Sequence, residues 1–171
     1  LCNLHCVWCD TDYTWNWKGT RFKHVRDEEP GYSKFDQKDM ILDWPSQKIA
    51  DTILGFNCPN IVVTGGEPLM QQKELEELLS MLRATNRELH IEIETNGTLA
   101  PSDQLAGLLD QYNVSPKLEN SGNKLSLREK PEAMRFFAGS PKSNFKFVVD
   151  TPDDMSEVLF IVQEYSIRPR Q

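Results

Sequence analysis

Short apolar runs that favour strands alternate along this chain with segments of helical periodicity, and this alternation is the main constraint on its fold. The pattern predicts strands at 60–64, 88–94, near Val114 and at 144–149, and helices after Pro45, at 69–84, at 102–109, from Pro131 and at 152–165. Strands that alternate with helices form βαβ units, in which the strands lie parallel. We therefore expect an α/β fold with at least four βα units, preceded by a loop with short irregular elements at 12–36.

Polar and glycine-rich residues gather where the predicted strands end. The segments are Thr64-Gly65-Gly66-Glu67, Glu94-Thr95-Asn96-Gly97-Thr98, Ser115-Pro116-Lys117 and Val149-Asp150. In parallel α/β sheets and barrels, ligands bind at the carboxyl ends of the strands. We expect these segments to form one ligand site.

Three cysteines at the start of the chain, Cys2, Cys6 and Cys9, are spaced C-x3-C-x2-C. This spacing is too tight for a disulfide framework. Three thiolates leave one iron of a four-iron, four-sulfur cluster without a protein ligand, whereas an electron-transfer ferredoxin closes the same cluster with four cysteines. The spacing therefore predicts an open metal position that a substrate or cofactor can occupy.

The combination of C-x3-C-x2-C with Thr64-Gly65-Gly66-Glu67-Pro68 resembles the radical S-adenosylmethionine (SAM) superfamily. In that superfamily the open iron holds the amino and carboxylate groups of SAM. The resemblance implies a 4Fe-4S cluster ligated by Cys2, Cys6 and Cys9, with SAM beside it. It also implies that the parallel βα units form an incomplete, modified (β/α) barrel, because the residues alone predict only a parallel α/β sheet.

A narrower resemblance begins at Cys6-Val7-Trp8-Cys9-Asp10-Thr11, which is followed by Thr14-Trp15. This element, with the polar strand ends in the same order, is similar to the 7-carboxy-7-deazaguanine synthase family. The resemblance covers essentially the whole chain. It implies a ring-contracting lyase of queuosine and deazapurine biosynthesis that uses SAM and Mg2+ to convert 6-carboxy-5,6,7,8-tetrahydropterin into 7-carboxy-7-deazaguanine with loss of ammonia.

The same resemblance assigns roles to individual residues. Thr11 would supply a hydroxyl oxygen to Mg2+, a cation that prefers oxygen ligands, and Thr64 would touch the substrate. The residues that would contact SAM are Trp8, Asp10, Gly66, Glu67, Ser115, Pro116 and Lys117, together with Glu94 and Asn96. The family also implies a homodimer and an electron donor such as flavodoxin or ferredoxin.

Length and charge limit the other function classes. The chain has 171 residues, enough for one domain, and a net charge of −7, which argues against general nucleic-acid binding. It has no apolar stretch long enough to cross a bilayer, and thiolates reserved for iron favour a reducing compartment, so we expect a cytoplasmic protein. From this length we expect a single radical SAM domain over residues 1–171. Because the cysteine loop would normally follow a strand, we expect that domain to lack its N-terminal residues, and it could also lack C-terminal ones.

Several alternatives remain open from the sequence. The three cysteines could hold zinc with His5, His24 or Cys58 as a fourth ligand, although Cys58 is expected to be a buried free thiol. Thr11 could serve only as a turn residue. At least one of Trp15 and Trp17 is expected in the core, and Lys146 could face either the cavity or solvent. A glycyl-radical activase shares the cysteine spacing, but it has no need for Asp-Thr after the third cysteine or for Ser-Pro-Lys.

Overall fold

The computed structural model describes residues 1–168, which form four strands, seven α-helices and four short 3-10 turns. The strands are β1 (Asn60–Val63), β2 (His90–Thr95), β3 (Gln111–Val114) and β4 (Ser143–Phe145). The helices are α1 (Gln37–Met40), α2 (Ser46–Gly55), α3 (Gln72–Thr85), α4 (Asp103–Leu108), α5 (Leu125–Arg128), α6 (Pro131–Gly139) and α7 (Asp154–Glu164). The 3-10 turns are η1 (Asp12–Thr14), η2 (Val25–Glu28), η3 (Pro68–Gln71) and η4 (Glu119–Ser121).

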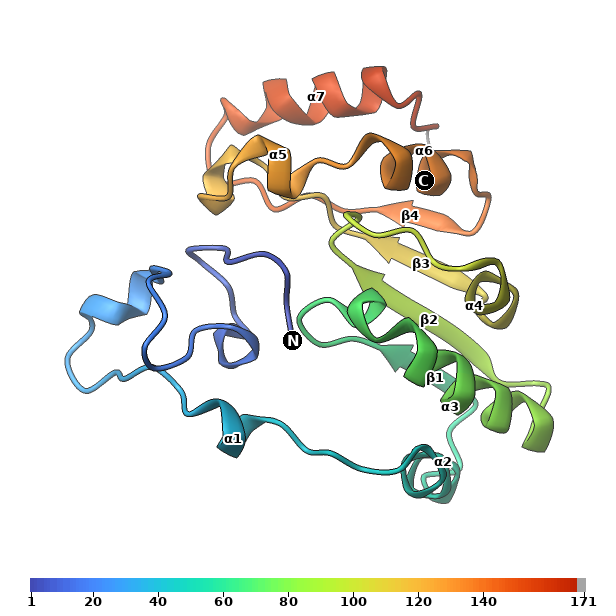
Figure 1. The fold of residues 1–171 in the computed structure, drawn as a ribbon. Coiled ribbons are helices and arrows are strands. Elements are labelled where there is room, and N and C mark those ends of the chain that lie inside the picture. Colours follow the sequence, from blue (N-terminus) through green and yellow to red (C-terminus); the bar gives the residue numbers. More distant parts are fainter. Residues whose placement is uncertain (169–171) are drawn as a thin grey trace.

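The four strands form one sheet in the order β1-β2-β3-β4, and every neighbouring pair is parallel. Parallel neighbours need a crossover, and the chain supplies α3 and α4 between the first strands and α5 and α6 before β4 (Figure 1). This arrangement confirms the predicted α/β class. Consecutive parallel strands with intervening helices are consistent with an incomplete barrel of the radical SAM type.

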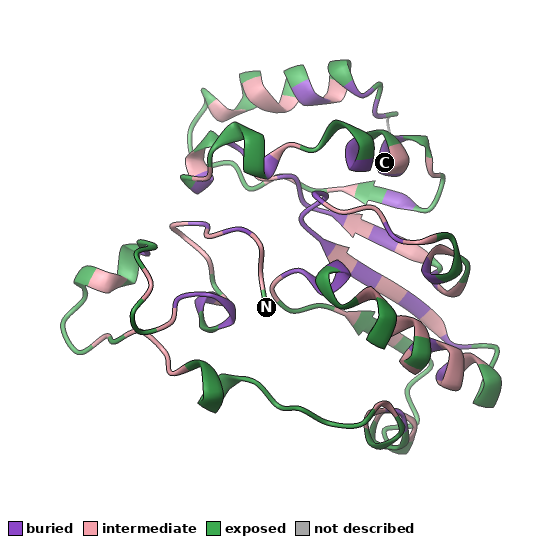
Figure 2. Cartoon of the chain, viewed as in Figure 1, coloured by how far each residue is buried: buried purple, intermediate pink, exposed green. Residues whose placement is uncertain are grey.

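The main core lies between the sheet and the helices that follow β1 and β2. Ile91 and Ile93 of β2 point into it, as do Leu79 and Leu82 of α3, and all four are fully buried (Figure 2). Each such side chain contributes about 1.5–3 kcal/mol when it is removed from water. The sheet is therefore a rigid platform whose strand ends lie at fixed positions.

The helix predicted from Leu69 begins three residues later, at Gln72. Pro68–Gln71 instead form a 3-10 turn, and the Glu67 carboxylate accepts a hydrogen bond from the Leu69 backbone N–H at its start. Proline at the first position suits such a start because its missing N–H has no intrahelical acceptor. The turn leaves Gly66 and Glu67 directly after the strand end.

The strand predicted at 144–149 is wrong in its extent, because β4 ends at Phe145. Its neighbour β3 ends at Val114, and the last backbone bond between them runs from Lys146 N to Val114 O at 2.8 Å. Beyond that point no strand partner remains for 146–149 in the described sheet. Lys146, Phe147 and Val148 continue along the cavity described below.

The segment before α1 folds without a strand of its own, as the sequence predicts. Trp15 is 2% exposed and packs edge-on against the rings of His5 and His24, which confirms the expectation that at least one tryptophan belongs to the core. Trp17 is half-buried and pairs in a single β-bridge with Phe35. An aromatic cluster thus packs against His5 of the cysteine loop.

Within residues 1–168, none of the helices combines the length and apolar character that crossing a membrane would require.

Candidate cofactor site

A cavity of about 480 Å³ lies between the cysteine loop and the carboxyl ends of the strands. Its lining comes from three sources: the loop at 2–15, the ends of β1, β2 and β3, and the segment after β4. The lining residues are Cys2, Leu4, Cys6, Trp8, Cys9, Asp10, Thr11, Trp15, Thr64, Gly65, Gly66, Glu94, Thr95, Asn96, Ser115, Lys117, Lys146, Phe147 and Val148. The strand-end segments therefore meet at one site, as the sequence predicts, except that Val149 and Asp150 stay outside the lining.

The three cysteines share the wall of this cavity, and all are free thiols. Burial raises the pKa of the Cys2 thiol and raises the pKa of the Cys6 thiol to about 11. The positive charge of Lys117 offsets only part of each rise. Iron binds the thiolate form, so a bound positive metal centre would replace the solvation that these buried sulfurs lose.

The donor set fits an iron–sulfur cluster better than a single zinc ion. Among residues 1–168, no three side chains of His, Cys, Asp or Glu converge on a point where one ion could sit. A cluster takes each of three thiolates on a different iron, so its ligands need not converge on one ion. Three thiols on a shared cavity wall with a nearby ammonium group match this requirement.

The alternative zinc ligands do not join the cysteines, because none of His5, His24 and Cys58 is among the residues that line the cavity. The His24 ring accepts a hydrogen bond from Arg26 N through Nδ1, and its Nε2 lies 2.8 Å from Cys9 O. The His5 ring stacks on Phe22. Cys58 is exposed between α2 and β1, which corrects the expectation of a buried thiol. The turn that leads into an edge strand leaves this side chain outside the core.

The first strand end holds the start of the cysteine loop through its backbone. Glu67 N donates to Leu1 O at 2.7 Å, and a side chain on Gly66 would come within 2.6 Å of Cys2 Cβ. Glycine is therefore needed at position 66 because a side chain there would collide with Cys2. Gly65 is needed for a different reason, since its φ of +145° is a conformation that glycine adopts at little cost. The two glycines bring the strand end and Cys2 into direct contact.

Glu67 lies below the cavity wall and is fully buried. Its carboxylate accepts hydrogen bonds from Leu69 N, from Asn96 N at 2.7 Å and from Thr95 Oγ1 at 2.9 and 3.0 Å. Burial raises the pKa of this carboxyl, and these hydrogen bonds act in the opposite direction. The structure thus places Glu67 as a clamp between the ends of β1 and β2, and neither it nor Pro116 lines the cavity.

Asn96 extends this clamp to the cysteine loop. Its Nδ2 donates to Asn3 Oδ1 at 2.9 Å, and Asn3 Nδ2 donates to Thr98 Oγ1 at 2.8 Å. Asn96 Oδ1 in turn accepts from the Thr98 hydroxyl. This chain of amides and hydroxyls fixes the residue that follows Cys2.

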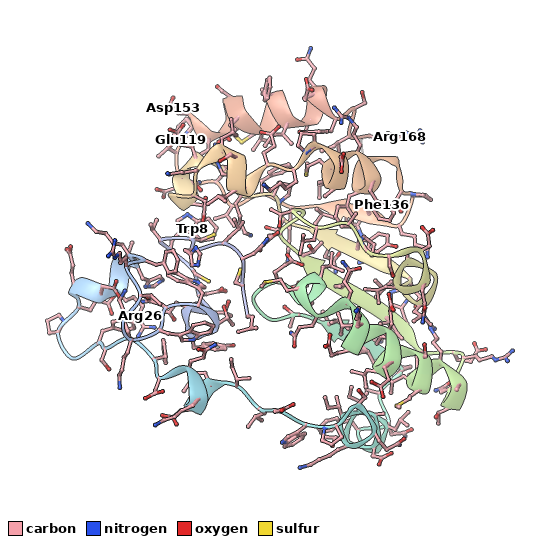
Figure 3. The ribbon with its side chains drawn as sticks, in the orientation of Figure 1. Trp8, Arg26, Glu119, Phe136, Asp153 and Arg168 are labelled. Carbon is pink, nitrogen blue, oxygen red and sulfur yellow. The ribbon has the colours of Figure 1, made fainter. Side chains whose placement is uncertain are left out.

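The loop after β3 holds the far end of the cysteine loop. Val7 N donates to Ser121 O at 3.0 Å, and the Trp8 indole N–H donates to Asn120 O at 3.0 Å. Figure 3 shows Trp8 on the side of the N-terminal segment that faces Glu119. The cysteine loop is therefore fastened at both ends to strand-end loops.

Charged groups from the strand ends and from the segment after β4 line the same cavity. Lys146 Nζ pairs with Glu94 Oε1 at 2.9 Å, and Thr64 Oγ1 donates to Glu94 Oε2 at 3.2 Å. Hydrogen bonding and charge from Lys146 lower the pKa of the Glu94 carboxyl. Lys117 donates to Ser115 Oγ at 2.8 Å, and burial lowers its ammonium pKa. This wall offers donors and acceptors to a polar ligand, and Lys146 faces the cavity rather than only solvent.

Thr11 also lines the cavity, with its Oγ1 3.5 Å from Cys9 Sγ. Its carbonyl accepts from Thr14 N and from Thr14 Oγ1, so its backbone does serve a turn. Its hydroxyl therefore lies beside a cysteine sulfur on the cavity wall.

Sequence reasoning missed several apolar lining residues. Leu4, Phe147 and Val148 belong to no motif, and Trp15 was expected only as a core residue; their place on the wall follows from the path of the chain. The early end of β3 directs Phe147 and Val148 along the cavity.

Comparison with known proteins agrees with the fold and the site. The profile of the radical SAM superfamily matches residues 1–118, which contain the cysteine loop and the first three strand ends. The chain belongs to the radical SAM superfamily, and this membership implies a 4Fe-4S cluster and SAM as cofactors.

The most informative relatives carry one name, 7-carboxy-7-deazaguanine synthase, which confirms the narrower resemblance. The chain is 36% identical to the protein of that name from Pyrobaculum aerophilum over 97% of this chain and 62% of the relative. It is 27% identical to those of Clostridium acetobutylicum and Rhodopirellula baltica, over 97% of this chain and 64% and 58% of the relatives. The chain thus spans about three fifths of the length of these proteins.

Replacing Gly66 by alanine is expected to displace Cys2 and to lower cluster retention. The added methyl group meets backbone and Cβ atoms that have little room to move, and such overpacking costs about 1–3 kcal/mol. Gly107→Ala in α4 is the matched control, because nothing lies within 4 Å of its added Cβ. Iron content after anaerobic reconstitution and thermal unfolding would measure both effects. Equal iron content in the two variants would contradict the close-contact argument.

Proposed function

We propose that this chain carries the catalytic domain of a 7-carboxy-7-deazaguanine synthase. The observation that carries the proposal is the joint placement of the Cys-x-Trp-Cys-Asp-Thr element and three polar strand ends around one cavity. Relatives with that name align with nearly the whole chain. The reaction converts 6-carboxy-5,6,7,8-tetrahydropterin into 7-carboxy-7-deazaguanine with loss of ammonia.

The residues divide the cavity into two functional walls. Cys2, Cys6 and Cys9 hold the cluster, which when bound supplies the electron that cleaves SAM to an adenosyl radical. On the wall formed by the strand ends, Ser115 and Lys117 bind SAM, with Glu94 and Asn96 reaching its ribose or methionine groups. Trp8 and Asp10 flank the adenosyl group. Gly66 has no side chain, so SAM can approach the protein backbone closely there. Thr64, which lies after β1 and bonds to Glu94, contacts the pterin.

The position of Glu67 changes its role in this proposal. Because its carboxylate is buried and bonded to the end of β2, it supports SAM binding through the strand ends that it joins. Buried Pro116 acts in the same indirect way, because it fixes the path between Ser115 and Lys117. Both residues therefore position the SAM pocket without forming its surface.

We place the Mg2+ site at Thr11, which lines the cavity and has its hydroxyl beside Cys9 Sγ. A hard cation usually keeps several oxygen ligands that are not protein groups, and the substrate carboxylate can provide one of them. An electron donor such as flavodoxin or ferredoxin, a homodimeric assembly and a cytoplasmic location complete the proposal.

The activity test is an anaerobic assay of the full-length protein with a reconstituted cluster, SAM, a strong reductant and 6-carboxytetrahydropterin. Mass spectrometry should detect a product lighter than the substrate by one ammonia, and Mg2+ should stimulate its formation. Accumulation of 5′-deoxyadenosine without this product would show radical chemistry with a different substrate. That result would contradict the proposal and favour an activase.

Thr11→Val tests the metal assignment because it keeps the side-chain shape and removes the hydroxyl. The concentration of Mg2+ that gives half-maximal product formation should rise roughly ten-fold or more, as expected on loss of an interaction at a metal site. Thr85→Val, an exposed change at the end of α3, is the control and should leave the Mg2+ dependence unchanged. An unchanged Mg2+ dependence in Thr11→Val would remove Thr11 from the metal site.

A further inference from the structure

Asn123 lies in the loop that follows β3 and touches the cysteine loop at two points. Its Oδ1 accepts a hydrogen bond from the backbone N–H of His5 at 2.9 Å, and its Nδ2 lies 3.3 Å from Cys6 Sγ. No sequence motif marks this residue as part of the site. One side-chain amide therefore fixes both the backbone before Cys6 and the Cys6 sulfur.

The orientation of this amide follows from its partners. A backbone N–H can only donate, so the oxygen of Asn123 must face His5 and its NH2 group must face Cys6. The same NH2 group also reaches Ser121 Oγ at 3.2 Å. The Asn123 amide that points at the Cys6 sulfur is thus held by His5 N at its oxygen and by Ser121 Oγ at its nitrogen.

The neighbouring backbone reinforces this arrangement. Ser121 O accepts from Val7 N at 3.0 Å, and Val7 N–H belongs to the residue directly after Cys6. Ser121 is fully buried, and its hydroxyl donates to Leu118 O at 2.7 Å. The loop that carries Asn123 is therefore docked on both sides of Cys6.

A hydrogen bond to a cluster sulfur has a known electrostatic consequence. A donor near a cysteine thiolate stabilises negative charge on that sulfur, and hydrogen bonds to the sulfurs are among the factors that set cluster potentials. One-electron reduction adds one negative charge to the cluster without breaking a bond. A fixed N–H donor therefore stabilises the reduced form more than the oxidised form and raises the reduction potential.

We propose that Asn123 is a positioning residue that raises the reduction potential of the cluster through its N–H donated to Cys6. The inference depends on the cluster that superfamily membership implies, and not on the pterin substrate. The inference and the proposed activity can therefore be tested separately.

The test is a potentiometric titration of the full-length, anaerobically reconstituted protein without SAM, followed by electron paramagnetic resonance of the reduced cluster. Mediators and dithionite supply the single electron. The proteins to compare are the wild type, Asn123→Ala, Asn123→Asp and the control Asn120→Ala. Asn120 has the same side chain in the same loop, and its Oδ1 accepts from Trp8 Nε1 of the cysteine loop at 3.3 Å. Its NH2 group donates to Val148 O and Asp154 Oδ2 and not to a cysteine sulfur, so this variant loses a contact with the cysteine loop without losing a donor to the cluster.

Asn123→Ala should shift the midpoint potential to more negative values at wild-type iron content. Asn123→Asp should shift it at least as far, because it keeps an acceptor for His5 N, offers no N–H and adds negative charge. Asn120→Ala should titrate at the wild-type potential. Wild-type potentials in both Asn123 variants would overturn the inference. Loss of the cluster from both variants with circular dichroism unchanged would also overturn it, because Asn123 would then be a purely structural clamp.

Discussion

Replacing Cys6 by alanine should abolish formation of a complete cluster and reduce SAM cleavage to background. Cys6 is one of three thiols on the cavity wall, and two thiolates leave too few ligands to retain the cluster. The fold should survive, because the change removes one small buried side chain that belongs to neither core cluster. Iron and sulfide content, the visible spectrum and 5′-deoxyadenosine formation in the full-length protein would measure the effect.

Cys58→Ala is the matched control for this experiment. Cys58 is exposed and donates only to Asn60 O at 3.3 Å, away from the cavity lining. Its replacement should leave iron content and SAM cleavage at wild-type values. Full cluster loading in Cys6→Ala, or loss of the cluster in Cys58→Ala, would show that the three-cysteine assignment is wrong.

Replacing Glu67 by alanine should produce the largest loss of stability of any single change at the site. The substitution leaves the buried donors Leu69 N, Asn96 N and Thr95 Oγ1 without their acceptor. Each unsatisfied buried group costs about 1–3 kcal/mol, so the free energy of unfolding should fall by about 3 kcal/mol or more. Denaturant unfolding of the cluster-free protein, followed by circular dichroism, would measure this change.

Two further variants separate the loss of the Glu67 hydrogen bonds from the loss of its negative charge. Glu67→Gln keeps one acceptor oxygen but turns an NH2 group towards N–H donors, so its loss should be smaller than that of Glu67→Ala. Glu88→Ala changes an exposed glutamate before β2, and its effect should stay within about 0.5 kcal/mol. If Glu67→Ala unfolds like Glu88→Ala but binds SAM poorly, Glu67 acts on the cofactor directly and the clamp interpretation is wrong.

The fold was predictable from sequence because hydrophobic periodicity and strand ends are local signals. The β-branched run that became β1 and the alternation that became β2 needed no tertiary information. The extent of β4 was not predictable, because Phe147 and Val148 favour a strand locally and only the end of β3 at Val114 stops the pairing. Cys58 was misplaced for a related reason, since burial of a cysteine depends on how an edge strand is covered.

The site shows the same division between local and tertiary information. Motifs located Cys2, Cys6, Cys9 and the polar strand ends, because their chemistry is carried by residue type and spacing. They did not reveal that Glu67 faces inward, because its partner Asn96 lies 29 positions away and is brought close only by the parallel pairing of β1 and β2. The contact of Asn123 with Cys6 could not be predicted for the same reason, since the two residues are 117 positions apart in the sequence.

The central claim is that the cysteine loop and the strand ends hold a cluster and SAM side by side in one cavity. The most direct test is electron paramagnetic resonance of the reduced, reconstituted full-length protein with and without SAM. Binding of SAM to an open iron should change the g-values of the cluster signal, and Cys58→Ala should show the same change as the wild type. A cluster signal that is identical with and without saturating SAM would contradict the account.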